Sequence, residues 1–296
     1  MSNLVLSNMP LTLTVGLAIL TDPQGRGRGT PFFAETAIVV PMLNHQARLY
    51  LPEQITSKTQ DGDEKDQPSD ENSWWTRNRA YAFSFFFGAS NPKMKKNGRR
   101  FRVYFYNEFK NDTSVGGKPI VLRPKTANTP MRCDEYLDYY EDSVFCPVLA
   151  GDISWQLRFY DVLACGCIPI VLEWPTSIGA DGRTWFVKNK FSVWQTYPFA
   201  KGRYGGSNSA IEVDFDLFVL RVPGNERDEK DMSCVRQTLE RLLRNEPETI
   251  RQMQINLGEN IDYITYKLGL EAHSSEDGFH RILKVLARNS KQLAAS

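Results

Sequence analysis

Residues 143–172 read SVFCPVLAGDISWQLRFYDVLACGCIPIVL, and the order of apolar and polar stretches within them decides the fold. An apolar run at 143–149 leads into a loop, a helical pattern runs from about 155 to 165, and a second apolar run covers 167–172. Gly166 suits the left-handed residue that ends a helix, and Ser154 suits the N-cap that begins one. A strand, a helix and a strand of these lengths predict a βαβ unit with parallel strands.

The same alternation extends to both sides of this unit. Apolar runs at 81–87 and 119–123 alternate with helical patterns at 99–110 and 133–142. Further helical patterns, with apolar residues three and four apart, follow at 227–244, 246–267 and 277–288. The chain is therefore predicted to be an α/β protein, with a Rossmann-like parallel sheet and helices on both of its faces.

An acidic stretch divides the chain. Residues 58–72 carry six acids against two lysines and no apolar side chain, which is the composition of a solvated linker. We place the linker at 57–74 and the folded domain at 75–290. Residues 1–56 hold one helix-like stretch and one apolar run that suits a strand, too little for a core of their own.

The charge and apolar content exclude several classes of protein. Lysine and arginine number 36 and aspartate and glutamate 35, so no net positive field favours nucleic acid as a partner. The apolar stretch Leu11–Leu20 is shorter than the roughly 20 residues that a helix needs to cross a bilayer. It also lacks the basic flank of a signal peptide, so we expect neither an anchor nor a signal segment in this chain.

Cysteine and histidine usage points away from metal chemistry. Five cysteines without a CxxC pair and three scattered histidines predict neither a disulfide framework nor a metal site. Cys146 and Cys167 lie in or beside apolar runs and are interpreted as structural rather than nucleophilic. A single glycosylation sequon, Asn111-Asp112-Thr113, would matter only in a secretory lumen.

Candidate site residues follow from the expected sheet. Ligands of such sheets bind outside the carboxyl ends of the strands, which here places Gly88, Gly151 and Glu173, with Trp174 beside it, at one edge. The first turn of the helix, at Ser154 and Trp155, would offer free backbone N–H groups to a diphosphate. Gly151 would let the backbone approach the ligand closely.

Arg158 and Asp161 are three residues apart and share one face of this helix. Arg158 could offset the charge of a diphosphate, and Asp161 could accept hydrogen bonds from ribose hydroxyls. The alternative is a surface ion pair worth about 0–1 kcal/mol. The ligand hypothesis requires that these side chains face an opening of the protein.

A basic stretch and the general base remain to be considered. The stretch from Lys93 to Arg102 is basic and could bind a polyanion, although a solvated loop is the favoured interpretation. No residue on the facing wall can be identified as a general base, so the catalytic residue is unknown.

The segment YLDYYEDSVFCPVLAGDISWQLRFYDVLACGCIPIVLEW, residues 136–174, resembles the signature of the exostosin-like glycosyltransferases. Weaker similarity extends over most of the chain, for example at FSFFFGA and EDGFHRILKVLA. The matching positions of the signature are Ser143, Phe145, Cys146, Gly151, Trp155, Arg158, Asp161, Gly166, Cys167, Ile168, Pro169 and Ile170.

The resemblance implies an inverting glycosyltransferase of two facing Rossmann-like halves, the second of which binds a nucleotide sugar, most often a UDP-sugar. Such an enzyme needs no obligatory metal or other cofactor and adds a hexosyl or pentosyl group to a glycan, in polysaccharide biosynthesis or protein glycosylation. Donor contacts carried over are Gly151, Arg158 and Asp161, with Asp161 standing where many members have Glu. The implied location is the Golgi membrane or lumen, and the implied partners are the donor, the glycan acceptor and further subunits in a hetero- or homo-oligomer.

Family members usually carry a membrane anchor and a complete first half, whereas 1–56 resembles only the tail of that half. Two functions therefore stay open at this point. One is a nucleotide-sugar-dependent glycosyltransferase, and the other is a non-catalytic nucleotide-sugar-binding or partner subunit, as in a truncated or inactive homologue.

Overall fold

The computed structural model describes residues 74–88, 99–125, 133–149, 157–173, 199, 201, 212–225, 228, 230–264 and 278–295. These residues belong to two compact units. The larger unit includes those at 74–173 and 216–261, and the smaller one those at 199–215 and 262–295. Residues 1–56 and nearly all of the expected linker lie outside the described residues, so the division into 1–56, 57–74 and 75–290 stays a prediction.

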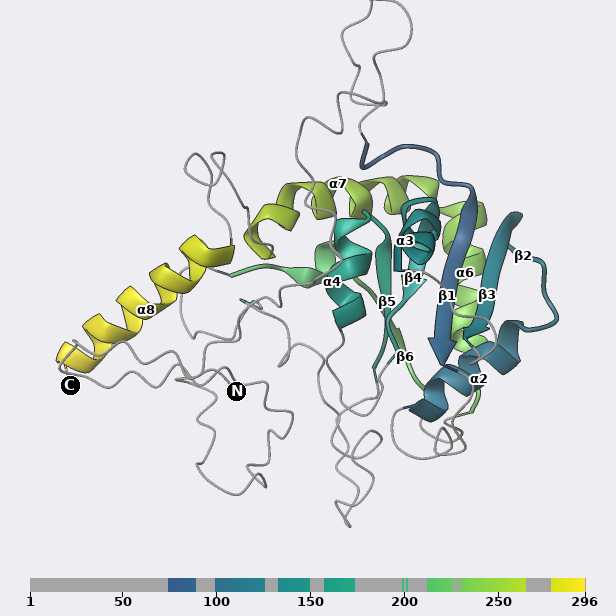
Figure 1. Ribbon diagram of the computed structural model, residues 1–296, viewed down its shortest axis with the longest axis horizontal. Helices are drawn as coiled ribbons and strands as arrows, with labels where there is room; N and C mark the ends of the chain where they lie inside the picture. The colour runs from purple at the N-terminus through teal and green to yellow at the C-terminus, as the bar shows by residue number, and fades with distance from the viewer. Residues whose placement is uncertain are drawn as a thin grey trace, which may run out of the picture. The chain divides into compact units, whose positions relative to one another are not determined.

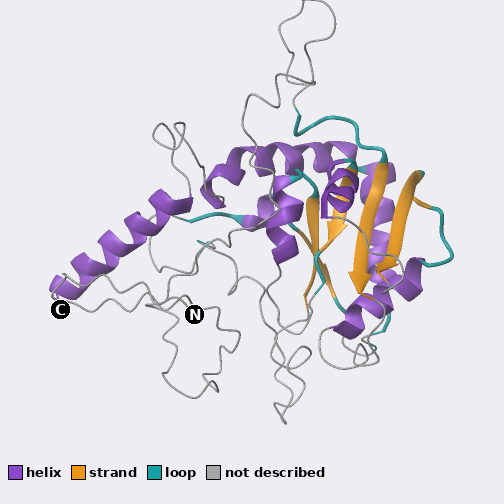
Figure 2. Cartoon of the chain, in the orientation of Figure 1, coloured by secondary structure: helices purple, strands orange, loops and turns teal. Residues whose placement is uncertain are grey.

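The larger unit is built on a six-stranded sheet in the order β2-β3-β1-β4-β5-β6 (Figures 1 and 2). Its parallel strands are β1 (Tyr81–Gly88), β3 (Lys118–Lys125), β4 (Ser143–Pro147), β5 (Ile168–Glu173) and β6 (Leu220–Pro223). The short β2 (Ser114–Val115) is antiparallel to β3 and forms a tight hairpin with it. The α/β fold with a mostly parallel sheet is thus confirmed, with one antiparallel edge that the sequence pattern did not indicate.

Helices cover both faces of this sheet. Side chains alternate between the two faces along β1, and those on each face pack against a different helix. Phe83 and Phe85 pack against Phe105 on α2 (Arg99–Phe109), with ring centroids 5.4 and 5.0 Å apart. Phe86 points to the other face and packs against Tyr140 on α3 (Cys133–Glu141). The five phenylalanine, alanine and serine side chains from Ala82 to Phe86 are all buried, so β1 is a fully covered central strand.

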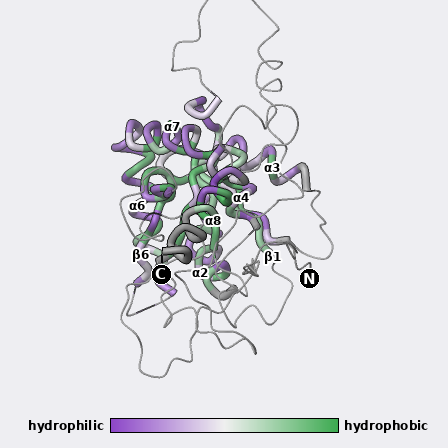
Figure 3. The backbone as a smooth tube through the Cα atoms, turned by 90° about the vertical axis from the view of Figure 1, so that its left-hand side faces the viewer, coloured by the Kyte–Doolittle hydropathy of each residue, from purple (hydrophilic) through white to green (hydrophobic). Residues whose placement is uncertain are grey.

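The core on the α2 face also takes in the carboxyl-terminal helices. Val235, Leu239 and Leu242 on α6 (Ser233–Asn245) join it, as do Ile250 and Met253 on α7 (Pro247–Ile264). Figure 3 shows apolar and polar residues alternating along α6 and α7, as expected for helices with one buried side. On the opposite face α4 (Leu157–Ala164) lies beside α3, and the smaller unit holds α8 (Gly278–Ala295).

Gly166 ends the turn between α4 and β5, as the sequence predicts. Its φ is +65°, and its N–H donates to the carbonyl of Leu163 at 2.9 Å. A Cβ at this position would lie 2.6 Å from Arg79 Nη2 and 2.6 Å from Trp74 Cζ3. Glycine is therefore required here both by the backbone conformation and by the close approach of two large side chains.

A disulfide joins Cys146 on β4 to Cys167 at the start of β5, with the two Cα atoms 5.9 Å apart. The expectation of no disulfide is wrong for this pair, whereas the interpretation of both cysteines as structural is confirmed. The two cysteines are 21 residues apart in sequence, a spacing that does not indicate a disulfide. They meet because β4 and β5, which the crossover connects, are neighbours in the sheet. The bond closes the loop that contains α4 and fixes both of its ends.

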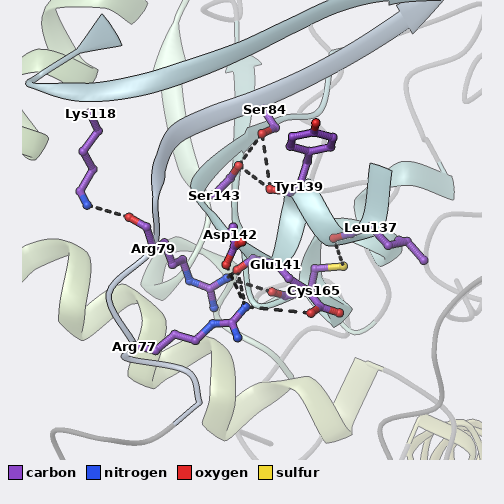
Figure 4. A network of polar contacts seen from close by, with 10 residues as sticks. All are labelled: Arg77, Arg79, Ser84, Lys118, Leu137, Tyr139, Glu141, Asp142, Ser143 and Cys165. Atoms are coloured by element: carbon purple, nitrogen blue, oxygen red, sulfur yellow. Dashed lines mark hydrogen bonds and ion pairs between the residues drawn. The ribbon is translucent and has the colours of Figure 1, made fainter. Parts of the chain in front are cut away.

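Two arginines ahead of β1 hold the carboxyl ends of α3 and α4 (Figure 4). Arg79 is 1% exposed and donates from Nη1 to the carbonyl oxygens of Glu141 and Cys165, the latter at 3.1 Å. Arg77 donates to the Glu141 carbonyl as well, at 2.8 Å, and lies 3.6 Å from the Asp142 carboxylate. Carbonyls at helix ends have no intrahelical donors, so a buried guanidinium there satisfies several of them at once.

We predict that Gly166→Ala destabilises the protein by about 3 kcal/mol, because it adds a steric clash to an unfavourable positive φ. The matched control is Gly117→Ala. Gly117 also has a positive φ, of +86°, but a Cβ there would meet nothing within 4 Å. Urea-induced unfolding should show a loss of only about 1 kcal/mol for that control. Equal losses for the two variants would contradict the packing that we describe around Gly166.

Removing the disulfide should lower the free energy of unfolding by about 3 kcal/mol, the value expected for a closed loop of this length. The double variant Cys146→Ala/Cys167→Ala tests this in thermal melts with and without reductant. Reductant should lower the melting temperature of the wild type and of Cys234→Ala, whose thiol is free, but leave the double variant unchanged. If full reduction left the melting temperature of the wild type unchanged, the disulfide would not stabilise the fold.

Candidate functional site

The candidate site lies where the strand order changes direction. β1 is flanked by β3 on one side and by β4 on the other, so the connections from these strands leave toward opposite faces of the sheet. The pairing of β1 with β4 is registered only at Tyr81–Ser143 and Phe83–Phe145, whereas β1 continues beside β3 as far as Gly88–Lys125. In open α/β sheets, ligands bind at the carboxyl ends of the two strands that flank such a switch point.

The structure brings three of the predicted strand ends to one edge of the sheet. β1 ends at Gly88, β4 ends at Pro147, and β5 ends at Glu173, which is registered opposite Pro223 of β6. Gly151, Ser154, Trp155 and Trp174 lie outside the described residues. The expected edge is therefore present, and the roles of the individual residues on it stay predictions.

Arg158 and Asp161 are both on α4, and neither forms the surface ion pair that was the alternative. Asp161 is only 6% exposed and Arg158 is half-buried. Within the described parts of the chain, Arg158 Nη1 and Asp161 Oδ1 are buried and have no hydrogen-bond partner. The burial of Asp161 runs against the requirement that both side chains face an opening, whereas the half-burial of Arg158 is compatible with it. Buried polar atoms without partners carry a free-energy cost.

Arg158 reaches across the site to β1. Its Cζ lies 5.9 Å from the centre of the Phe85 ring, which belongs to the strand on the other side of the switch point. The guanidinium therefore stands close to the place where the β1–β4 pairing ends. A positive group there suits an anionic ligand, since a guanidinium can donate two parallel hydrogen bonds to phosphate oxygens.

Two acidic groups in this region have raised pKa values. Burial raises the pKa of Asp161 to about 6, and the nearby Arg158 acts in the opposite direction without compensating. Burial also raises the pKa of Tyr140 on α3, with Arg158 acting against it. Buried groups with displaced pKa values gather at functional sites more often than elsewhere, which makes this cluster the best candidate among the described residues.

Two residues of the cluster were not assigned to the site from the sequence. Tyr140 lay within an expected helix without a further signal, and its role became visible only when α3 packed beside α4. Arg102 belonged to the basic stretch interpreted as a solvated loop, but it lies on α2 and donates from Nε and Nη2 to the Leu149 carbonyl. Leu149 is the last described residue before Gly151, so Arg102 fixes the chain just ahead of the predicted ligand loop.

The described residues contain neither a metal-ligand cluster nor a membrane-spanning helix. No group of three or more His, Cys, Asp and Glu side chains among them could hold a metal ion. None of the described helices has the length and apolar character needed to cross a bilayer.

Residues 45–193, half of the chain, match the family model described as the Exostosin GT47 domain. The matched range includes β1, β3, β4, α4 and β5, and hence the switch point with Arg158 and Asp161. No curated protein matches the chain.

We predict that Asp161→Asn stabilises the ligand-free protein at neutral pH. Because the folded-state pKa of about 6 exceeds the ordinary 3.8, the folded protein binds more protons than the unfolded chain between these values. Wild-type stability therefore falls as pH rises from about 4 to 6, by up to ~3 kcal/mol at 1.36 kcal/mol per unit. The advantage of the variant in thermal melts should be largest above about pH 7 and shrink as pH falls. An advantage independent of pH would show that the carboxyl group does not titrate in this way.

Proposed function

Because the chain belongs to the exostosin GT47 family, a family of glycosyltransferases, we propose that it transfers a sugar from a nucleotide-sugar donor to a glycan acceptor. The observation that carries this proposal is the half-buried Arg158 guanidinium beside β1 at the switch point. Its Nη1 is buried and has no hydrogen-bond partner among the described residues, which favours an anionic ligand such as the donor diphosphate.

The remaining donor contacts are assigned by position. Gly88 and Gly151 let the backbone approach the donor, while Ser154 and Trp155 contribute the start of the helix that precedes Arg158. Glu173, at the end of β5, accepts a hydrogen bond from a base or sugar hydroxyl. A UDP-sugar is the proposed donor, with no obligatory metal or other cofactor.

Asp161 is less accessible than Arg158. At 6% exposure its carboxylate lies behind the surface of α4, which makes a direct hydrogen bond to ribose harder to form than the contact from Arg158. Asp161 also influences Arg158 electrostatically, as its own pKa reflects. If Asp161 acts only by positioning Arg158, its substitution should weaken donors with and without a ribose 2′-hydroxyl to the same extent.

The proposed reaction is an inverting displacement at the anomeric carbon. An acceptor hydroxyl oxygen forms a new bond to C1 on the face opposite the nucleotide, and the bond from C1 to the diphosphate oxygen breaks. The hydroxyl proton passes to a general base, which is not assigned to any residue of this chain. Arg158 stabilises the negative charge that develops on the departing nucleoside diphosphate.

The buried Cys146–Cys167 disulfide supports a secretory location, since stable disulfides form in oxidising compartments. We therefore propose the Golgi lumen as the place of reaction. The acceptor is proposed to be a growing glycan of polysaccharide or glycoprotein synthesis. Association with further subunits is a separate proposal that no described contact addresses.

Calorimetry with a panel of UDP- and GDP-sugars tests donor binding. Arg158→Ala should weaken binding of the preferred donor by roughly 10–100-fold, since a charge-assisted hydrogen bond contributes about 1.5–3 kcal/mol. The matched control is Arg241→Ala. Arg241 lies on α6, forms an ion pair with Glu246 and belongs to none of the predicted donor contacts, so its substitution should leave the affinity unchanged. Equal affinities for wild type and both variants, with unchanged melting temperatures, would remove Arg158 from the site.

Transfer of a labelled sugar to glycan acceptors separates the enzyme from its alternative. Label in the acceptor, lost in Arg158→Ala, supports the transferase. Donor binding without transfer across the acceptor panel instead supports a non-catalytic nucleotide-sugar-binding or partner subunit. Retention on heparin that disappears when Lys93 to Arg102 are neutralised would point to a polyanion binder.

A further inference from the structure

We propose that Asn111 is an N-glycosylation site. Asn111-Asp112-Thr113 is the one Asn-X-Ser/Thr sequon in the chain, with Asp rather than Pro at its centre. Asn111 lies in the turn after α2, and both Asn111 and Thr113 are exposed. The acceptor amide and the required hydroxyl are therefore on the surface of the folded protein, where a bulky glycan meets no core.

The backbone on both sides of Asn111 is held in place. Asp112 N–H donates to the Phe109 carbonyl at 3.0 Å, and the Thr113 carbonyl accepts from Ile120 N–H at 3.1 Å. The Asp112 carboxylate is 2.7 Å from Arg236 Nη2, whose guanidinium also lies over the Phe109 ring at 4.7 Å. The neighbours of Asn111 are thus anchored to α2, β3 and α6.

Asn111 itself takes no part in that network. Among the described residues its side chain forms no hydrogen bond, and it lies in an exposed turn. Attachment of a glycan therefore breaks no contact of the folded domain. A sequon buried in β1 or α6 would have been incompatible with the same fold.

The position also keeps a glycan away from the proposed donor site. β1 and β3 are parallel, so α2 between them runs back toward the amino ends of the strands. Its 11 residues span about 16 Å at 1.5 Å per residue, and Asn111 lies beyond the far end. The proposed donor lies at the opposite edge, where β1, β4 and β5 end.

The compartment required for the modification is supported by a separate observation. The Cys146–Cys167 disulfide indicates folding in an oxidising environment, which for a eukaryotic chain is the secretory lumen that also contains the oligosaccharide donor. The inference shares this location with the proposed function but does not depend on transferase activity. Failure of sugar transfer would therefore leave it standing.

The chemistry is a transfer from a lipid-linked oligosaccharide diphosphate. The Asn111 side-chain nitrogen forms a bond to C1 of the first sugar while the bond from C1 to the diphosphate oxygen breaks. The amide nitrogen releases one proton to the surrounding water, and the lipid diphosphate leaves with the bonding electron pair. No oxidant or reductant is needed.

Peptide mass spectrometry on the protein purified from its own cells is the direct test. After release of N-glycans by the amidase in heavy-oxygen water, the Asn111 peptide should carry an aspartate labelled with the heavy isotope. Recovery of this peptide only with unmodified asparagine would overturn the proposal, whether Cys146 and Cys167 are bonded or reduced.

Variants of the full chain, translated into microsomes behind an added cleavable signal peptide, test the sequon itself. The wild type should migrate more slowly by a single glycan, and the shift should vanish after glycosidase treatment. Asn111→Gln and Thr113→Ala should lose the shift, Thr113→Ser should retain it, and the matched control Ser114→Ala, an exposed neighbour outside the sequon, should also retain it. A shift that persists in Asn111→Gln, or is absent in translocated wild type, would contradict the assignment.

Discussion

The architecture depends on one buried cation. Arg79 lies against the Trp74 ring and donates from Nη1 to carbonyl oxygens at the ends of both α3 and α4, while Arg77 adds a further hydrogen bond to the end of α3. Helix ends offer several carbonyl acceptors in one place, and Arg79 Nη1 meets two of them, whereas Nε and Nη2 are buried without a hydrogen-bond partner among the described residues. Gly166 leaves the space that this arrangement needs, because any side chain there would collide with Arg79 and Trp74. With its carboxyl end fixed in this way, α4 can direct its other end to the carboxyl edge of the sheet.

The crossover that carries α4 is constrained a second time by the Cys146–Cys167 bond. Loop closure by a disulfide lowers the entropy of the unfolded chain, and the closed loop here contains the candidate site. Rigid support of this kind matters because α4 holds two buried polar groups, Arg158 Nη1 and Asp161 Oδ1, that have no hydrogen-bond partner among the described residues. Functional sites commonly keep such unfavourable groups, and the surrounding structure compensates for them.

The strands and helices of this region could be predicted from the sequence, but the order in which they lie side by side could not. The βαβ unit at 143–172, the glycine that ends its helix and the phenylalanine-rich β1 all follow from apolar runs and local conformational preference. The disulfide was missed because neighbouring strands bring together cysteines that look unrelated by spacing. Tyr140 and Arg102 were missed for the same reason, since each reaches the site from a different helix. The four-residue β6 and the two-residue β2 carried too little pattern to be recognised, and both owe their existence to pairing with strands already in place.

The local structure, the α/β class and the family follow from residues that are neighbours along the chain, because periodicity and signature motifs are local properties. The strand order, the place where the β1–β4 pairing ends and the burial of Asp161 depend instead on contacts between distant segments. Helical spacing puts Arg158 and Asp161 on one face whether that face meets water or protein. Which of the two it meets depends on how α4 packs against α3 and β1, and that packing is set by long-range contacts that no local pattern encodes.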